Sequence, residues 1–494
     1  MNHKLMRKSS LAEAVSAAII ASVIATPVLA AEDDAKNDER IIVTATKSAE
    51  AIQEVPLAIT SLSGEFMEEV HLDDIKDLIA YTPGITGNST DSFLDSISIR
   101  GVRTDDYGAG GDLSNAVFKN DLYEGRTGSA VSTLFDMDRA EVVRGPQGFL
   151  FGRNAIGGAI SSHTRRAEME VTGGYLDIEL AEFNKIKVEA GVNVPVTDNF
   201  AMRFSGVYHT EESFIDNNYP GGELPDTDTQ AIRWSTTYEG SSFNVFTMVE
   251  YEDRQHPGTA YRAITEGPVW EEFMSVYGDY DYDGNGNTLN NNGGIRGDAR
   301  SIDTDAMWGI QDNSENLNLQ LKLEKEFSWA DLTINAGYKD HDYFYSEDWE
   351  GTPLPIGSWK NDQSGDYSQL EFRLNDKGDG PLGWYVGASL YQENLDVLVS
   401  GSVMQDHLCQ YYSYYAAGWG APESGPGRTC ATFYYGYYAL GPNDDPNMLE
   451  TSHVDAKNDG WAAYINLDYQ ITDTVDAEIG IRHSVDNKDI SNSL

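Results

Sequence analysis

The stretch Asn316-Leu317-Asn318-Leu319-Gln320-Leu321-Lys322-Leu323-Glu324-Lys325 has a leucine at every second position and a polar or charged residue at those between. Successive side chains of a strand point to opposite faces, so this stretch predicts a strand with one apolar and one polar face. The pattern recurs from residue 461 to 471 and from 475 to 482, with only Thr472-Asp473-Thr474 between. The second half of the chain is therefore predicted to consist of two-faced antiparallel strands.

The connections between these strands alternate between short and long. We predict about eleven strands, near residues 171–181, 184–194, 199–210, 230–240, 243–253, 316–326, 331–343, 366–375, 382–396, 460–471 and 475–487. Short turns on one side and long loops on the other are typical of an up-and-down membrane β-barrel, and a soluble β-sandwich is the alternative. Eleven antiparallel strands would leave both edges unpaired in lipid, so we expect that C-terminal strands are missing from this sequence.

Composition excludes several other classes. The chain has 494 residues, with 34 Lys plus Arg against 80 Asp plus Glu, and its formal charge of −46 would repel nucleic acid. Hydrophobic residues make up 40% of the chain, which favours a packed structure over disorder. After residue 31 no apolar run approaches the roughly 18 residues that a membrane-spanning helix needs.

The N-terminus has the features of an export signal. Lys4, Arg7 and Lys8 precede a mostly apolar stretch, and Val28-Leu29-Ala30 offers small residues for cleavage, so residues 1–30 are predicted to be a signal peptide. Export implies an oxidising compartment, and we therefore expect that Cys409 and Cys430, the two cysteines of the chain, form a disulfide. Two free, buried cysteines are the alternative.

Residues 39–166 differ from the second half, because short strands, helices and glycine turns alternate there, as in a small α+β unit. Residues 73–80 are predicted to be helical, and Ser96-Ile97-Ser98-Ile99-Arg100 is predicted to be a short strand ended by Gly101. The longest distinctive motif runs from Asp138-Arg139-Ala140-Glu141-Val142-Val143-Arg144-Gly145-Pro146-Gln147-Gly148 to Ile160. Its glycines suit tight turns, and no Walker phosphate loop is present.

Three stretches together carry a resemblance: residues 138–160, the short turn Ile99-Arg100-Gly101, and Glu39-Arg40-Ile41-Ile42-Val43-Thr44-Ala45-Thr46-Lys47. In these the chain resembles the TonB-dependent outer-membrane receptors of Gram-negative bacteria. The resemblance implies an N-terminal plug inside the lumen of a 22-stranded barrel. It divides the chain into a signal peptide at 1–30, a periplasmic leader at 31–47, a plug domain at 48–166 and an incomplete transmembrane barrel at 167–494. Phe118-Lys119-Asn120-Asp121-Leu122-Tyr123 departs from the family's usual strand.

The resemblance also implies roles for particular residues. A TonB box that binds a TonB-type inner-membrane protein corresponds to Ile41, Ile42, Val43, Thr44, Ala45 and Thr46. The family's two plug arginines, which pair with barrel-wall glutamates, correspond to Arg100 and Arg144. We expect Glu371 to be their wall partner, because the neighbouring Leu370 and Phe372 would face lipid and leave Glu371 in the lumen.

Ligand contacts are predicted at aromatic residues, because aromatic rings stack on sugars and chelators: Tyr107, Tyr123, Tyr411, Tyr412 and Trp419. Asp279, Asp281 and Asp283 begin like a calcium loop, but Asn290 stands where the bidentate glutamate belongs, so no metal is assigned. No nucleophile, base and orienting residue can be identified, so we expect no enzyme and no cofactor.

The family implies energy-coupled import across the outer membrane. Its commonest cargo is a ferric siderophore; an oligosaccharide or other carbon source is the runner-up. A passive porin is the alternative from another class, since a porin needs neither plug nor TonB box.

Overall fold

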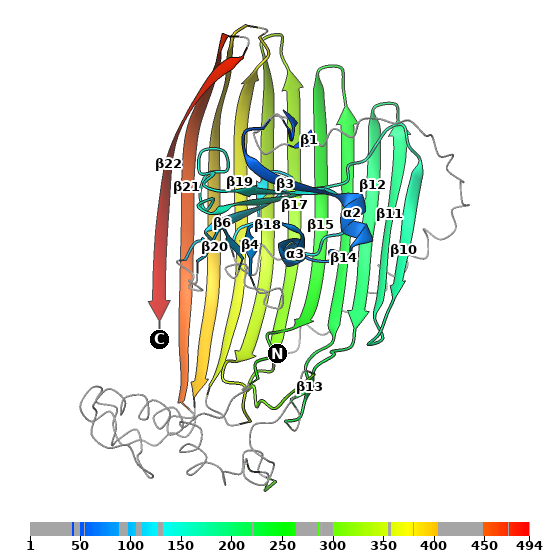
Figure 1. Ribbon diagram of the computed structural model, residues 1–494, viewed down its shortest axis with the longest axis vertical. Helices are drawn as coiled ribbons and strands as arrows, with labels where there is room; N and C mark the ends of the chain where they lie inside the picture. Colours follow the sequence, from blue (N-terminus) through cyan, green and yellow to red (C-terminus); the bar gives the residue numbers. More distant parts are fainter. Residues whose placement is uncertain are drawn as a thin grey trace, which may run out of the picture.

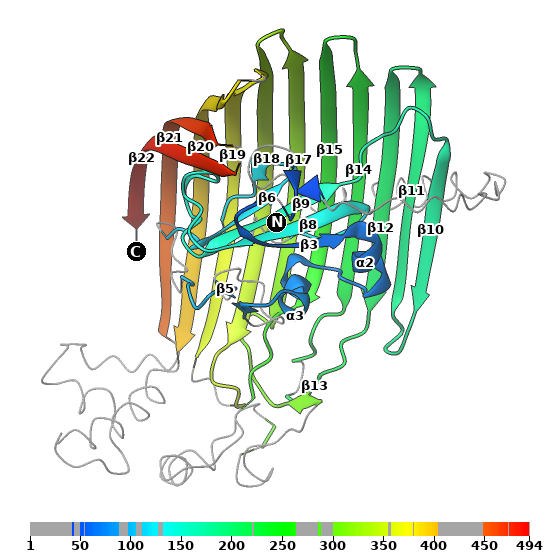
Figure 2. The same ribbon diagram turned by 45° about the horizontal axis from the view of Figure 1, so that its top comes forward.

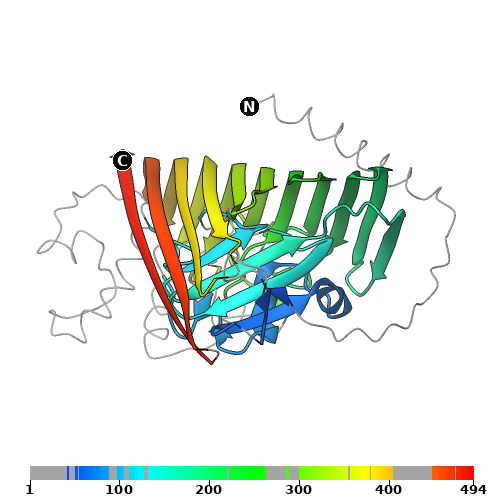
Figure 3. The same cartoon turned by 90° about the horizontal axis from the view of Figure 1, so that it is seen from above.

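The chain folds into a tall curved wall of long strands with a smaller unit against its concave face (Figures 1 and 3). The computed structural model describes residues 42–43, 50–53, 55–87, 97–104, 111–126, 132–219, 222–262, 285–286, 288, 300–353, 357–378, 380–403, 448–472 and 474–493. None of the helices in these ranges is long and apolar enough to span a membrane.

The wall is one eleven-stranded antiparallel sheet in which strands that are consecutive in the sheet follow one another along the chain. It consists of β10 (Gly173–Leu180), β11 (Ile186–Thr197), β12 (Phe200–Glu211), β14 (Thr227–Glu239), β15 (Phe243–Pro257), β17 (Gln311–Glu326), β18 (Ala330–Asp348), β19 (Ser358–Asp376), β20 (Leu382–Val403), β21 (Met448–Thr472) and β22 (Val475–Ser493). This up-and-down order confirms the predicted fold class. A small parallel pair, β13 (Asp216–Asn217) with β16 (Ser301–Ile302), lies among the long connections.

Side-chain alternation fixes which face of the wall looks outward. In β17, Leu319 and Leu321 are 38% and 43% exposed, while the alternating Asn318 and Gln320 are buried. Leu319 is paired with the exposed Val249 of β15, so the apolar face continues across neighbouring strands. Aromatic side chains gather near the short turns, where Trp329 stacks on Phe327 and Trp384. This outer surface matches the apolar belt and aromatic girdle of a membrane β-barrel.

Most wall strands from β14 onward are longer than predicted, and nearly all the extra length lies at the ends with long connections, whereas β10 is shorter than predicted. β18 runs to Asp348 instead of residue 343, and β21 begins at Met448 instead of residue 460. Outside the lipid both faces of a strand meet water or loops, so the apolar and polar alternation on which the prediction relied disappears there.

The smaller unit contains a five-stranded mixed sheet in the order β3-β8-β9-β6-β7. The unit comprises β3 (Ala58–Ser63), α2 (Gly64–Glu69), the 3-10 helix η1 (Ile75–Asp77), α3 (Leu78–Tyr81), β4 (Ile85–Thr86), β5 (Ser98–Ile99), β6 (Asn115–Lys119), β7 (Leu122–Tyr123), β8 (Met137–Arg144) and β9 (Gly158–Thr164). Its core is apolar and fully buried around Ile75, Leu78, Ile99 and Ile160. The helix predicted over 73–80 is shorter, because the chain forms a 3-10 turn before α3.

The glycine-rich motif joins β8 to β9. Gly145 has φ +102°, a conformation that L side chains rarely adopt, and this turn ends β8. A Cβ on Gly158 would lie 2.3 Å from the carbonyl oxygen of Val143, so glycine is needed where β9 begins beside β8. The motif therefore serves close backbone packing.

Figure 2 shows the unit, which we call the plug, lying across the inner face of the middle wall strands. The curvature of the wall wraps around it, and β21 and β22 bend toward its side (Figure 3). The signal peptide predicted for residues 1–30 and the two cysteines Cys409 and Cys430 lie outside the described residues.

One buried histidine of the plug predicts a pH dependence. His163 in β9 is 8% exposed, and burial lowers its pKa to about 4 from an ordinary value of 6.5. Between pH 6.5 and 4, His163 is protonated in the unfolded plug but neutral in the folded plug. The free energy of unfolding should therefore fall as the pH drops from 6.5 to 4, by up to about 3 kcal/mol. Urea unfolding of the plug, followed by protease susceptibility at each pH, measures this loss.

In the same assay His163→Gln should flatten the pH dependence in this window. His71→Gln, at an exposed plug histidine, is the matched control and should retain it. Equal slopes for the two variants would contradict the assignment to His163.

Candidate functional site

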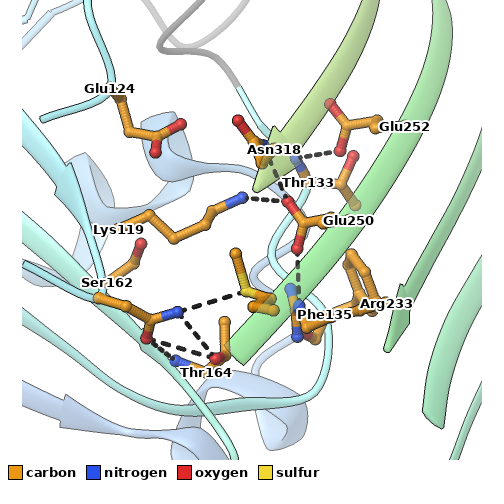
Figure 4. Close-up of polar contacts among 12 residues, drawn as sticks. Lys119, Glu124, Thr133, Phe135, Ser162, Thr164, Arg233, Glu250, Glu252 and Asn318 are labelled. Atoms are coloured by element: carbon orange, nitrogen blue, oxygen red, sulfur yellow. Dashed lines mark hydrogen bonds and ion pairs between the residues drawn. The ribbon is translucent and has the colours of Figure 1, made fainter. Parts of the chain in front are cut away.

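A buried triad of charges joins the plug to the wall. Lys119, the last residue of β6, places its Nζ 2.7 Å from Oε1 of Glu250 in β15. The other oxygen, Oε2, lies 2.6 Å from Nε of Arg233 in β14. All three side chains are 2% exposed or less, and Figure 4 shows them meeting where plug and wall touch.

Neighbouring charges and hydrogen-bond donors stabilise the charged forms of Lys119 and Glu250. Burial alone would lower the pKa of Lys119, but the carboxylates of Glu250 and Glu124 outweigh it, and the pKa is raised. Asn318 of β17 also donates to Glu250, at 3.3 Å. Close by, Glu252 accepts a hydrogen bond of 2.9 Å from the backbone N–H of Thr133 in the plug (Figure 4). Lys119 is therefore charged and held by the wall.

Similar contacts join the plug to every strand from β11 to β20. In chain order of the wall they are Lys187 with Asp73, Arg203 with Asp136, Arg233 with the Phe135 carbonyl, Glu250 with Lys119, Lys322 with Asp121, Lys339 with Glu124, Gln369 with the Tyr123 backbone, and Glu393 with Arg126. Arg254 of β15 adds a pair with Asp74, and Lys488 of β22 a pair with Asp112. The plug is thus anchored along a band that follows the curvature of the wall.

In most of these ion pairs the wall carries the positive charge and the plug the negative one. Among the described residues, the wall supplies the cation and the plug the carboxylate in the pairs of Lys187, Arg203, Arg254, Lys322, Lys339 and Lys488. The reverse holds for Lys119 and Arg126. In a chain with only 34 Lys plus Arg, this concentrates basic side chains on the inner face of the wall, opposite an acidic plug surface.

Two plug carboxylates show how strongly the wall cations act. Burial would raise the pKa of Asp136, but the hydrogen bonds and charge of Arg203, at 2.7 Å from Nε to Oδ2, lower it instead. Burial of Asp73 is outweighed in the same way by Lys187, and its pKa is lowered. Both carboxylates stay ionised throughout the neutral range, so these pairs persist there and weaken only in strong acid.

An aromatic cluster lies on the same interface. The guanidinium of Arg153 in the plug lies 3.8 Å from the ring centroid of Tyr391 and 5.1 Å from that of Tyr123. Tyr123 is buried, meets Tyr367 of the wall edge to face, and its hydroxyl accepts from Asn154 at 2.7 Å. In this structure the Tyr123 side chain is enclosed between plug and wall, and its contact with ligand stays a prediction.

Arg100 and Arg144, predicted to pair with Glu371, have other neighbours in this structure. Arg144 donates from Nη1 to the Pro83 carbonyl at 2.7 Å, and the Arg100 guanidinium lies beside Gly145, so both connect turns within the plug. Among the described residues, no ion pair joins either arginine to Glu371. Glu371 lies on the inner face of β19, where it accepts from the hydroxyl of Tyr464 at 2.5 Å and lines a cavity of about 90 Å³ with Arg153 and Arg482.

Most of the other predicted site residues fall outside the described part of the chain. These are Tyr107, Tyr411, Tyr412 and Trp419 for ligand, Asp279, Asp281 and Asp283 for calcium, and Ile41, Thr44, Ala45 and Thr46 of the TonB box. The remaining box residues form β1 (Ile42–Val43), which pairs antiparallel with β2 (Glu50–Ala51).

The sequence did not predict the contact of Lys119, Glu250 and Arg233, although two features of the sequence indicated Lys119 and Glu250. Lys119 and Asp121 lie in the stretch that departs from the family's usual strand, and both contact the wall. In β15 the inward positions alternate with the apolar outward Val249, so Glu250 and Glu252 were recognisable as lumen residues. Which plug residue each would meet could not be read from sequence.

The comparisons with known proteins agree with this geometry. The family model described as the TonB-dependent receptor plug domain matches residues 51–159, which include four strands of the plug sheet and the start of the fifth, β9. These residues therefore form a plug domain of the TonB-dependent receptor type.

Relatives of known name are receptors for iron carriers. The chain is 29% identical to the ferripyoverdine receptor of Pseudomonas aeruginosa over 191 residues, 38% of this chain and 22% of that protein. It is 25% identical to the ferrioxamine B receptor of Salmonella typhimurium over 341 residues, 64% of this chain and 45% of that protein. The chain thus spans less than half the length of these curated relatives.

Solved structures share the fold. The ferric yersiniabactin uptake receptor of Yersinia pestis aligns with a TM-score of 0.65 at 14% identity, over 88% of this chain and 57% of that one. The Pseudomonas aeruginosa receptor bound to ferripyoverdine aligns with a TM-score of 0.60 at 17% identity, over 92% of this chain and 54% of that one. These relatives, together with the apolar outer face, place the receptor in the outer membrane of a Gram-negative bacterium.

The triad predicts where the plug is held most strongly. Glu250→Gln removes the anion and leaves Lys119 and Arg233 buried together, which should weaken plug docking by about 3–5 kcal/mol. Cells carrying this variant should admit more of a large hydrophilic antibiotic than the wild type, as measured by growth inhibition at equal outer-membrane protein levels.

Arg144→Ala is the informative comparison, because within the described residues Arg144 bonds to the Pro83 carbonyl of the plug and not to the wall. It should leave permeability closer to that of the wild type than Glu250→Gln does. A larger leak from Arg144→Ala would show that the triad is not the main anchor.

Proposed function

We propose that this chain acts as an energy-coupled importer of ferric siderophores across the outer membrane. Ligand binds from the side of the long connections, and a TonB-type inner-membrane protein engages the segment that contains β1 (Ile42–Val43). Its pull then loosens the plug from the wall and opens a path for the cargo.

One observation carries this proposal: charged and hydrogen-bonding side chains hold the plug on the inner face of the wall. Ion pairs and hydrogen bonds follow the interface from β11 to β20, and water can take the place of both partners of such a pair once the plug begins to move. An apolar interface of the same extent would offer water no such exchange. The ion pairs and hydrogen bonds from β11 to β20 therefore suit a plug that is held on the wall until the TonB-type protein pulls on it.

The coupling segment supports the same proposal. Ile42 and Val43 are already extended and hydrogen-bonded as a strand with Glu50 and Ala51. An extended segment beside the plug is suited to strand addition, in which main-chain hydrogen bonds give the affinity. The plug begins directly afterwards, with β3 at Ala58, so tension on this segment reaches the five-stranded sheet.

The cargo class rests on the relatives, whose names refer to ferripyoverdine and ferrioxamine B. An oligosaccharide or another carbon source is the second candidate, since aromatic side chains of the kind predicted at Tyr411, Tyr412 and Trp419 also stack on sugar rings. The disulfide between Cys409 and Cys430 belongs to the same stretch and remains a prediction.

Deletion of residues 41–46 tests energy coupling. Cells that express the gene encoding this chain should take up iron-55 bound to a hydroxamate or pyoverdine siderophore, and the deletion should abolish uptake while leaving siderophore binding to the cells unchanged. Radiolabelled oligosaccharides, measured in the same cells, test the second candidate.

Replacement of residues 32–37 by glycine and serine is the matched control, because it alters the predicted leader and leaves the box intact. Undiminished uptake after deletion of 41–46 would indicate a passive porin. Uptake of sugar but not of iron would reject the siderophore assignment and retain energy coupling.

A further inference from the structure

Three carboxyl groups converge at the end of the wall that carries the long connections. Asp305 belongs to the segment between β16 and β17, Asp348 is the last residue of β18, and Glu350 follows it in the turn to β19. One carboxylate oxygen from each lies within 4.8 Å of the other two.

Neighbouring contacts hold these segments together. The hydroxyl of Ser346 donates to the Gly309 carbonyl at 2.9 Å, and the Met307 N–H donates to the Ser358 hydroxyl at 3.0 Å. Gly351, with φ +66°, approaches the backbone of Arg262 so closely that a Cβ would lie 2.8 Å from its nitrogen. The first part of the connection between β15 and β17, at 261–262, thus lies against the same turn.

Backbone groups orient two of the carboxylates. Oδ1 of Asp348 accepts from the N–H groups of Glu350 at 3.0 Å and Gly351 at 3.4 Å, and Oε2 of Glu350 accepts from the Thr352 N–H at 2.9 Å. Their remaining oxygens, Oδ2 and Oε1, are buried without a hydrogen-bond partner, as is Oδ1 of Asp305. Asp348 is 0% exposed, so its unpaired oxygen is buried, and one oxygen of its carboxylate lies within 4.8 Å of the other two groups.

This arrangement lacks a compensating positive charge. Within the described residues, no lysine, arginine or histidine forms an ion pair with Asp305, Asp348 or Glu350. Burial raises the pKa of Asp305 to about 7, and burial followed by the charges of Asp348 and Asp305 raises the pKa of Glu350 well above its usual range. Buried carboxylates in such a position are stabilised either by protons or by a cation.

The donor set selects the cation. All three free ligand atoms are carboxylate oxygens, which suit hard ions such as calcium and magnesium and not the transition metals that prefer nitrogen or sulfur. Magnesium requires near-ideal octahedral geometry and keeps several waters, whereas calcium accepts several carboxylates in a flexible arrangement. The long-connection end of such a barrel faces the cell exterior, where sites with millimolar to submillimolar calcium affinity are filled.

We propose that Asp305, Asp348 and Glu350 bind one calcium ion, which ties the connection between β15 and β17 to the turn between β18 and β19. This site is distinct from the acidic loop at Asp279, Asp281 and Asp283 and does not depend on the cargo of the receptor. Its role is to fix the outer connections that a ligand meets first.

Calorimetric titration of the full chain, purified in detergent and stripped with EDTA, tests the site directly. Calcium chloride should bind at one site per chain and raise Tm, while magnesium should have a much smaller effect. Asp348→Asn keeps the size of the side chain and should weaken calcium binding about tenfold or more, since a carboxylate ligand is lost. It should also raise Tm in EDTA, because one uncompensated buried charge is removed.

Asp396→Asn is the matched control. Asp396, His453 and Asp455 form another acidic group on the wall, but His453 Nε2 bonds to Asp396 at 3.0 Å and both side chains are about half exposed. This variant should bind calcium like the wild type. If Asp348→Asn does not fold, Asp305→Asn provides the second test.

Absence of calcium binding by the wild-type chain, an equal response to magnesium, or an unchanged calcium affinity in both Asp348→Asn and Asp305→Asn would overturn the proposal. A Tm that depends on pH but not on calcium would show that protons, and not a metal ion, stabilise the three carboxylates.

Discussion

The buried pairing of Lys119 with Glu250 and Arg233 is the interaction on which the arrangement of this receptor depends. Charges removed from water are stabilised only if partners reach them from both sides, and here one partner comes from the plug and two from the wall. Neither unit alone satisfies these groups. The plug therefore has one preferred position on the wall, and the other ion pairs extend that position from β11 to β20.

The wall itself obeys a different constraint. A strand in lipid must direct every second side chain to hydrocarbon and pair all of its backbone groups with neighbours. The exposed Leu319, Leu321 and Val249 on one face and the buried Asn318, Gln320 and Glu250 on the other are the direct result. Because the inner face is free of the lipid constraint, it can carry the charges that bind the plug.

These two constraints together explain how the plug can be held firmly on the wall and still be moved when a force acts on it. Many plug contacts are polar or charged, beside apolar ones such as that of Phe135 with Val207 and Ala231, so the interface is specific in position and partly exchangeable with water. The predominance of wall cations opposite plug carboxylates also gives the contact a uniform polarity, in a chain whose overall charge is −46. The carboxylates of Asp305, Asp348 and Glu350 near the outer turns have no basic partner among the described residues. There the proposed calcium ion from solution supplies the positive charge.

The sequence by itself determined the class of fold. Period-two alternation gave the eleven wall strands and their order, because lipid acts on each strand locally, and the motif at 138–160 identified the plug, because close backbone packing requires glycine at fixed positions. The strand ends beyond the lipid were underestimated, since alternation is lost where both faces meet water.

Only the tertiary structure decided which charges meet. Lys119 and Glu250 are 131 residues apart, and their contact depends on how the plug is rotated within the wall. For the same reason Arg100 and Arg144, which the family resemblance assigned to the wall, connect turns inside the plug, and Asp305 meets Asp348 and Glu350 across two connections. Local sequence fixes the face on which a side chain lies, whereas the identity of its partner is set by the docking of separate units.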